Sequence, residues 1–246
     1  MSKSASPTDD KSATMTLAAL IPARGGSKGI PRKNLAMCGD RSLLGWTADA
    51  ALRSGVIDRA ILSTDDDEIA AAGIALGLEA PFRRPAELSN DGALMLGVMQ
   101  HALAALRAEG AEVEALVLLQ PTSPFRRPHH VREAVEKFRA GKAATLVSVV
   151  RVPHRFVPEG QMRAQDGRLV PYFGGEVGKT RRQDKETLFG RNGPAVLIVR
   201  SSVLDAGALY GDPTVGYEMD EIASIDIDAP EDLRLADHLM RTGYVP

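Results

Sequence analysis

The sequence has little cysteine, no long apolar run and almost no net charge, and each shortage narrows what the protein can be. Cys38 is the single cysteine among 246 residues, which excludes a disulfide within the chain and a zinc site built from several thiolates. We therefore expect a reducing, cytoplasmic setting. No stretch of about 18 apolar residues occurs, so we expect no membrane partner. The formal net charge of −2 argues against a nucleic-acid partner held by bulk electrostatics.

What is present is the composition of a folded domain, with 44% hydrophobic and 25% charged residues. Residues 1–15 are polar and lack the apolar core of a signal peptide, so we predict a disordered tail there. We predict that residues 16–246 form one domain.

Short apolar runs that alternate with helical segments predict an α/β fold. Such alternation is typical of βαβ units, so we predict a three-layer, Rossmann-like arrangement with a mainly parallel sheet. The predicted strands cover residues 17–21, 60–63, 115–119, 145–150, 195–200 and 222–227. The predicted helices cover residues 42–54, 65–76, 91–107, 128–139, 203–209 and 229–240.

Regular periodicity is lost between residues 151 and 192, a stretch with several prolines and glycines. So long an irregular segment inside a domain indicates a functional excursion or a projection that packs on a partner. Its basic residues Lys179, Arg181 and Arg182 suit an acidic ligand. We predict an inserted segment for dimerisation and ligand binding, and the competing interpretation is a mobile lid over the chain's own site.

A glycine-rich, basic loop directly follows the first predicted strand. Its residues 23–29 read Ala-Arg-Gly-Gly-Ser-Lys-Gly. Adjacent glycines allow close backbone approach, and Arg24 and Lys28 add the positive charge that a triphosphate requires. Lys33 and Asn34 follow a few residues later. The pattern is neither a Walker A loop nor G-x-G-x-x-G. A solvated glycine turn is the alternative, but the position after the first strand favours a binding site.

Two carboxylates alternate with isoleucines in residues 224–228, Ser-Ile-Asp-Ile-Asp. On a strand, Asp226 and Asp228 would project to one face, where a hard divalent cation could bridge them to phosphate oxygens. Without a cation they would repel, and one would tend to hold a proton. The alternative interpretation has Asp228 cap the following helix while Asp226 faces solvent.

Polar loops after other strands add candidates that are weaker on their own. Residues 120–127, Gln-Pro-Thr-Ser-Pro-Phe-Arg-Arg, follow a buried strand and offer Gln120, Thr122, Ser123 and Arg126 as polar contacts. Arg84 precedes the long third helix. Each loop is equally well explained as an ordinary turn.

Taken together in order, these blocks resemble the acylneuraminate (CMP-sialic acid) cytidylyltransferases. The resemblance runs from about residue 17 to residue 240. Its blocks are residues 21–35, 62–65, 84–88, 119–124, 191–193 and 224–228. It implies a nucleotidyltransferase-type fold, a homodimer, and transfer of CMP from CTP to an acidic sugar with Mg²⁺ as cofactor.

The resemblance also implies roles for individual residues. Arg24, Ser27 and Lys28 would hold the CTP phosphates, assisted by Lys33 and Asn34. Arg84 would lie by the nucleotide, and Gln120 would face the sugar acid. Asp226 and Asp228 would carry Mg²⁺, while Arg191 and Asn192 would shape the site beside the sugar.

Sugar recognition is where the sequence departs from sialic-acid members. Those members carry a sugar-contacting lysine where residues 152–158 read Val-Pro-His-Arg-Phe-Val-Pro, and aromatic residues where this chain has Phe189-Gly190. Another nonulosonic acid, such as legionaminic or pseudaminic acid, is therefore an open alternative to sialic acid. KDO, a sugar 1-phosphate, another acidic acceptor, and a non-catalytic nucleotide-binding module are further alternatives.

Overall fold

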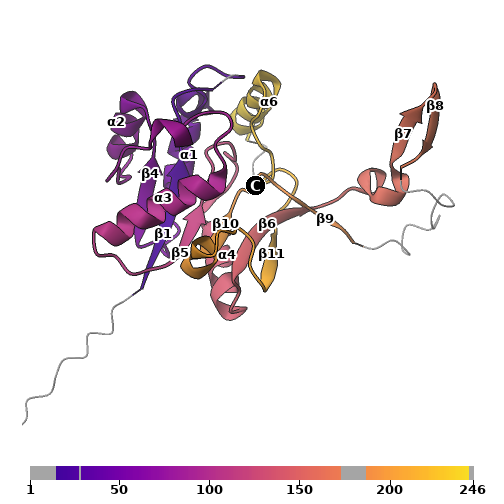
Figure 1. Cartoon of the computed structure of the whole chain (residues 1–246). Helices are drawn as coiled ribbons and strands as arrows, with labels where there is room; N and C mark the ends of the chain where they lie inside the picture. Colours follow the sequence, from indigo (N-terminus) through magenta and orange to yellow (C-terminus); the bar gives the residue numbers. More distant parts are fainter. Residues whose placement is uncertain (1–14, 28, 173–186, 244–246) are drawn as a thin grey trace, which may run out of the picture.

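The computed structural model describes residues 15–27, 29–172 and 187–243 (Figure 1). Residues 1–14 of the predicted tail, Lys28 and Arg182 lie outside these ranges. The strands are β1 (Thr16–Pro22), β2 (Met37–Cys38), β3 (Arg41–Ser42), β4 (Arg59–Ser63), β5 (Val113–Leu118), β6 (Thr145–Arg151), β7 (Met162–Gln165), β8 (Arg168–Pro171), β9 (Phe189–Arg191), β10 (Leu197–Arg200) and β11 (Thr214–Glu218). The α-helices are α1 (Leu43–Leu52), α2 (Asp67–Ala75), α3 (Met95–Ala108), α4 (Pro128–Ala140), α5 (Ser201–Asp205) and α6 (Pro230–Arg241).

The central sheet has the strand order β4-β1-β5-β10-β6-β11, and β9 pairs with the end of β6 in antiparallel fashion. β1 is parallel to β4 and β5, and β11 is parallel to β6, whereas β10 is antiparallel to both of its neighbours. The mainly parallel sheet is therefore confirmed, with one reversed strand. All four parallel strands from β4 to β6 end at one edge, so the loops that follow them gather there.

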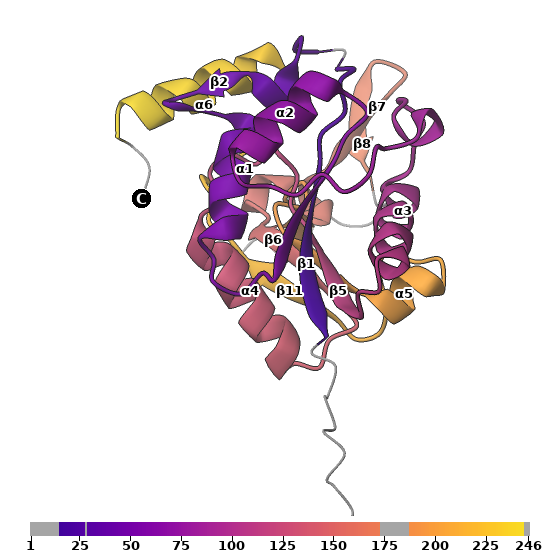
Figure 2. The same cartoon turned by 90° about the vertical axis from the view of Figure 1, so that its left-hand side faces the viewer.

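Helices cover both faces of this sheet, which confirms the three layers (Figure 2). Alternate residues of β1 pack to opposite sides: Leu17, Ala19 and Ile21 join the core under α1 and α4, and Ala18 and Leu20 join the core under α3 and α5. Two helices begin where the sequence predicts. Ser42 caps α1 by accepting from the Gly45 N–H, and Asp66 caps α2 by accepting from the Ile69 N–H.

Some predicted elements differ from the structure, and the helix predicted at residues 203–209 is the shorter α5 at Ser201–Asp205. Residues 222–227 form turns and irregular backbone instead of a strand, and the last strand of the sheet is β11. The alternation in residues 224–228 imitates a strand, but the main-chain partner of Ile227 is the carbonyl of Thr122 in a loop. The long third helix begins at Met95, not at residue 91.

The described part of the irregular segment projects from the body. β6 and β9 run out together, and the hairpin of β7 and β8 lies far from the sheet (Figure 1). We call residues 152–172 and 187–189 the hairpin arm. No helix among the described residues is long and apolar enough to cross a membrane.

Candidate functional site

The basic loop, residues 23–34, is held by the residues that follow β4. Asp65 Oδ1 accepts from the Gly25 N–H at 2.9 Å. Asp66, while capping α2, also accepts from Arg32 Nη1 at 2.6 Å. Inside the loop, Asn34 Nδ2 donates to the Arg24 carbonyl at 3.0 Å. Two of these hydrogen bonds therefore hold the described residues of this loop to the residues after β4, and the third lies within the loop.

An open cavity of about 200 Å³ lies beside this loop at the carboxyl edge of the sheet. It gathers six of the predicted site residues from three separate parts of the sequence. These are Arg24, Ser27, Lys33, Asn34, Arg84 and Gln120. Three of these side chains are cationic, which concentrates positive charge in the cavity.

Arg84 is buried at the wall of the cavity. Its Nε donates to Ser63 Oγ at 3.0 Å, and its Nη2 donates to the Ser63 carbonyl. Burial lowers the pKa of Arg84 to about 10, opposed by the charge of Asp65 and reinforced by that of Arg24. It stays cationic at neutral pH. Arg24 itself forms an ion pair with Asp91, with 2.7 Å between Nη2 and Oδ1.

Residues 224–228, which we call the aspartate segment, lie against the basic loop and against the loop of residues 120–127. The Ile227 N–H donates to the Thr122 carbonyl at 2.8 Å, and Lys33 Nζ donates to the Ile227 carbonyl at 2.8 Å. Lys33 Nζ also lies 3.7 Å from Asp228 Oδ1. A Cβ on Gly29 would lie only 3.0 Å from the Asp228 carbonyl. The structure thus brings the predicted carboxylates next to the basic loop.

The two carboxylates have unequal surroundings. The Asp228 side chain is 81% exposed and does not cap α6, because Asp232 accepts from the Asp228 and Ala229 N–H groups. Burial raises the pKa of Asp226, and the charge of Asp228 raises it further, while Thr122 and Lys33 oppose the shift. The Thr122 hydroxyl lies close enough to Asp226 to lower its pKa. Even so, neither Thr122 Oγ1 nor Asp226 Oδ1 has a hydrogen bond of ordinary geometry among the described residues.

The resemblance gives Asn192 and Arg191 one shared role, but in the structure their side chains lie in different surroundings. Asn192 is buried: its Oδ1 accepts from Ser148 Oγ at 2.6 Å, and its Nδ2 donates to Ser224 Oγ at 2.9 Å. It therefore ties β6 to the aspartate segment. Arg191 points to the surface, where its Nη1 donates to Tyr210 Oη at 2.8 Å, and it does not line the cavity.

The expectation that Arg126 offers a polar contact to a ligand is wrong. The sequence offers it as a polar contact at a strand end, but its side chain is only 1% exposed and bonds to protein groups alone. Two arginines stand next to each other in the loop, and the sequence carries no signal of which one is buried.

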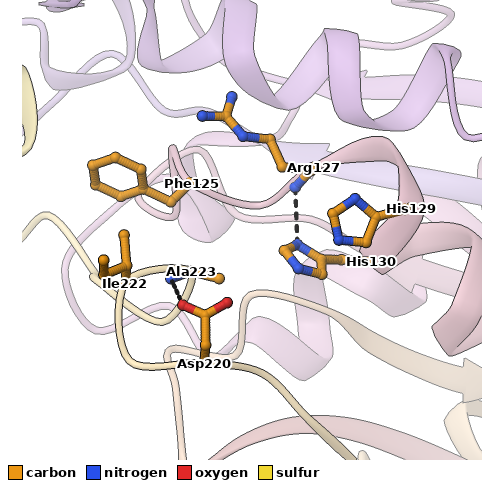
Figure 3. Close-up of a pocket in the computed structure, with 7 residues that line it drawn as sticks. All are labelled: Phe125, Arg127, His129, His130, Asp220, Ile222 and Ala223. Carbon is orange, nitrogen blue, oxygen red and sulfur yellow. Dashed lines mark hydrogen bonds between the residues drawn. The ribbon is translucent and has the colours of Figure 1, made fainter. Parts of the chain in front are cut away.

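A second cavity, of about 110 Å³, is lined by residues around the start of α4 and by residues just before the aspartate segment (Figure 3). Phe125, Arg127, His130 and Asp220 are among its lining residues, and none of the predicted site residues lines it. His130 Nδ1 accepts from the Arg127 N–H at 3.0 Å, which begins α4.

The structure is an α/β fold with a cavity lined by cationic side chains beside its first loop. A cytidylyltransferase family model matches residues 18–165, and the chain belongs to this family. It is 34% identical over 93% of its length to N-acylneuraminate cytidylyltransferase A of Danio rerio, of which it spans 52%. It is 30% identical to the CMP-N,N'-diacetyllegionaminic acid synthase of Legionella pneumophila, over 92% of this chain and 97% of that protein. The chain thus spans about half the length of the first relative and nearly all of the second.

Among solved structures, CMP:2-keto-3-deoxy-manno-octonic acid synthetase in complex with CTP superposes with a TM-score of 0.68 at 17% identity. The match covers 93% of this chain and 100% of that chain. At that identity the likeness concerns the fold.

Proposed function

We propose that the protein transfers CMP from CTP to the anomeric hydroxyl of a nonulosonic sugar acid and releases pyrophosphate. The observation that carries this proposal is the single cavity in which Arg24, Ser27, Lys33, Asn34, Arg84 and Gln120 converge. Family membership supports the same nucleotide, and the two relatives named above support the class of acceptor.

In this reaction the anomeric oxygen forms a bond to the α-phosphorus, the bond to the pyrophosphate breaks, and the hydroxyl proton leaves to solvent. Phosphoryl chemistry of this kind needs alignment and charge neutralisation rather than a covalent intermediate. Arg24, Lys33 and Arg84 supply fixed positive charge at the cavity, and Lys28 is proposed to join them. Gln120, at the end of β5, is proposed to orient the acceptor.

The aspartate segment fits a divalent cation. Asp226 offers a buried carboxylate oxygen without a hydrogen bond among the described residues, and Asp228 offers a second carboxylate two residues on. The described residues contain no group of three or more acidic, histidine or cysteine ligands. This suits Mg²⁺, which is usually held by one or two carboxylates together with substrate phosphates. Bound there, Mg²⁺ would neutralise charge on the phosphates.

The acceptor is proposed to be a nonulosonic acid, with legionaminic, pseudaminic and sialic acids as the first compounds to test. KDO, a sugar 1-phosphate and another acidic acceptor are the second group. We further propose a cytoplasmic homodimer in which residues 151–192 act as an inserted segment and Arg182 contributes to the acceptor site.

The test is pyrophosphate release by the purified protein, with CTP, Mg²⁺ and each acid in turn. We expect release only when CTP and a nonulosonic acid are both present, and little with ATP, GTP or UTP. Chelation of the metal by EDTA should stop it, and added Mg²⁺ should restore it. Specific CTP binding without turnover on any acceptor would instead identify a nucleotide-binding module.

A further inference from the structure

Arg126 is a fully buried cation in the loop of residues 120–127. An unpaired buried charge is costly, so its retention requires compensating hydrogen bonds. Nη1 donates to the carbonyls of Gln120, at 3.0 Å, and Ala195, at 2.8 Å. Nη2 donates to Thr47 Oγ1 at 2.7 Å. All three partners are protein atoms and Arg126 itself does not line the cavity, so Arg126 acts on protein segments and not on substrate.

The partners of Arg126 come from three elements that meet at the carboxyl edge of the sheet. Gln120 follows β5, Ala195 precedes the antiparallel β10, and Thr47 lies in α1. A planar guanidinium that donates to two carbonyls from one nitrogen fixes the spacing between their chains. Arg126 therefore sets the gap between the loop that carries Gln120 and the turn of residues 192–195.

The turn of residues 192–195 also contacts the aspartate segment. Gly193 has φ of +117°, and a Cβ built on it would lie 3.5 Å from Ser123 Oγ and 3.6 Å from Asp226 Cγ. Asn192 donates to Ser224 Oγ, and the Thr122 carbonyl accepts from Ile227 N–H. The turn is thus enclosed by the residue 120–127 loop on one side and by Asp226 on the other, and Arg126 anchors its base.

The CTP end of the cavity is anchored differently. Arg84 is held by Ser63, the basic loop by Asp65 and Asp66, and Lys33 by Ile227. Arg126 makes none of these contacts itself, and Ile227, which bonds to both Lys33 and Thr122, is the link between the two ends. Loss of Arg126 should therefore disturb one end of the site more than the other.

We propose that Arg126 is a positioning residue for the acceptor end of the site: its guanidinium fixes the carbonyls of Gln120 and Ala195, and so holds Gln120 and the Gly193 turn at the spacing that the sugar acid requires. This inference rests on the proposed cytidylyl transfer.

The test compares Arg126→Met with Arg127→Met. The neighbouring Arg127 lies over the Trp46 ring and lines the second cavity, so it is a matched control (Figure 3). For Arg126→Met we expect kcat/KM for the acceptor to fall about 30-fold or more, the scale of a misplaced reacting group. The Kd for CTP, measured by calorimetry, should change less than about threefold, within the context dependence of one lost neighbour. Arg127→Met should stay close to wild type in both measurements.

A folded Arg126→Met protein with acceptor kinetics like wild type overturns the proposal. So does a variant in which CTP affinity and acceptor kcat/KM fall by equal factors, because that result indicates a general structural loss.

If Arg126→Met does not fold, Thr47→Val and Thr47→Ser replace it, since they leave the guanidinium in place. Thr47→Val should raise the acceptor KM more than the CTP KM, and Thr47→Ser should restore it; no difference between the two overturns the proposal. A wild-type protein that releases no pyrophosphate with any acid refutes the proposed function instead.

Discussion

At the scale of single residues, each described cation in the cavity already has a protein partner that a phosphate would share or replace. Arg24 pairs with Asp91, and Lys33 with the Ile227 carbonyl and Asp228. Such partly exposed pairs contribute little to folding stability. Their effect is to hold the side chains at the cavity, so less side-chain freedom is lost when an anion binds.

Replacing either carboxylate of the aspartate segment should nearly abolish turnover. We expect Asp226→Asn and Asp228→Asn to weaken the proposed Mg²⁺ site because each removes one negative ligand. The protein should remain folded, since asparagine keeps the shape of aspartate and the Asp228 side chain is 81% exposed. Turnover measured across a Mg²⁺ titration is the check. Glu231→Gln, an exposed acid at the start of α6, is the control. Wild-type turnover by either variant at ordinary Mg²⁺ would remove the metal assignment.

Gly25 and Gly26 should respond differently to an added methyl group. A Cβ on Gly25 would lie 2.7 Å from Asp66 Oδ2 and 3.0 Å from Asp66 Cβ, while a Cβ on Gly26 would meet nothing within 4 Å. Asp66 cannot easily move, because it caps α2 and binds Arg32. We expect Gly25→Ala to destabilise the protein by about 1–3 kcal/mol, on the scale of overpacking. Gly26→Ala should stay within about 0.5 kcal/mol of wild type in urea unfolding. Equal stability of the two variants would contradict this account of the loop.

Much of the cavity could be predicted residue by residue, because its members stand in short blocks directly after strands. Their partners could not. Lys33 meets Ile227 from the far end of the chain, and Arg126 is distinguished from Arg127 only by packing. Local sequence shows which side chains carry charge, whereas tertiary contacts decide which of them face the ligand.

At the scale of elements, the predictions succeed where periodicity and caps agree. β1, α1, β4, α2 and α4 all lie within a few residues of their predicted positions. β11 is not predicted because Thr214–Glu218 contains Gly216, which weakens a strand pattern. The reversed β10 could not be predicted either: its direction follows from the return of the chain through β9, and no local pattern encodes that path.

The start of α4 should make stability depend on pH through His130. Burial lowers its pKa to about 4, with His129 and Arg126 acting in the same direction and Asp220 and Glu133 opposing. The folded state thus keeps His130 neutral down to about pH 4, whereas in the unfolded state His130 gains a proton below its ordinary pKa of 6.5. This contribution to stability is present above about pH 6.5 and is lost as the pH falls toward 4.

The measurement is urea unfolding of wild type and His130→Gln between pH 5 and pH 8. We expect the wild type to lose about 1–2 kcal/mol more than His130→Gln between pH 7 and pH 5. His129→Gln, at the exposed neighbouring position, should lie closer to the wild type than His130→Gln, because it removes one contribution to the shift and leaves the burial of His130 in place. Parallel pH curves for wild type and His130→Gln would show that His130 is not buried in the neutral form.

At the scale of the whole molecule, the hairpin arm is the feature that a single chain does not explain. The arm projects from the body (Figure 1). Its large exposed apolar residues are Phe156, Met162, Leu169, Tyr172 and Phe189. Apolar groups gathered on one projection indicate a surface that another protein covers. A second copy in a closed two-fold arrangement is the commonest such partner.

If the arm reaches the partner's cavity, two inactive variants should restore each other. Asp226→Asn damages the body of a protomer, and Arg182→Ala changes the inserted segment outside the described residues. In a mixed dimer with shared sites, one of the two sites combines an intact body with an intact segment from the other protomer. Random reassociation makes about half of the dimers mixed, so about a quarter of wild-type activity should return. A lid that closes over its own subunit would restore none, because every protomer then keeps its own defect. The control mixture pairs Asp226→Asn with Asp228→Asn, which damages both bodies and should stay inactive. A monomer by light scattering that retains full turnover would exclude the shared site directly.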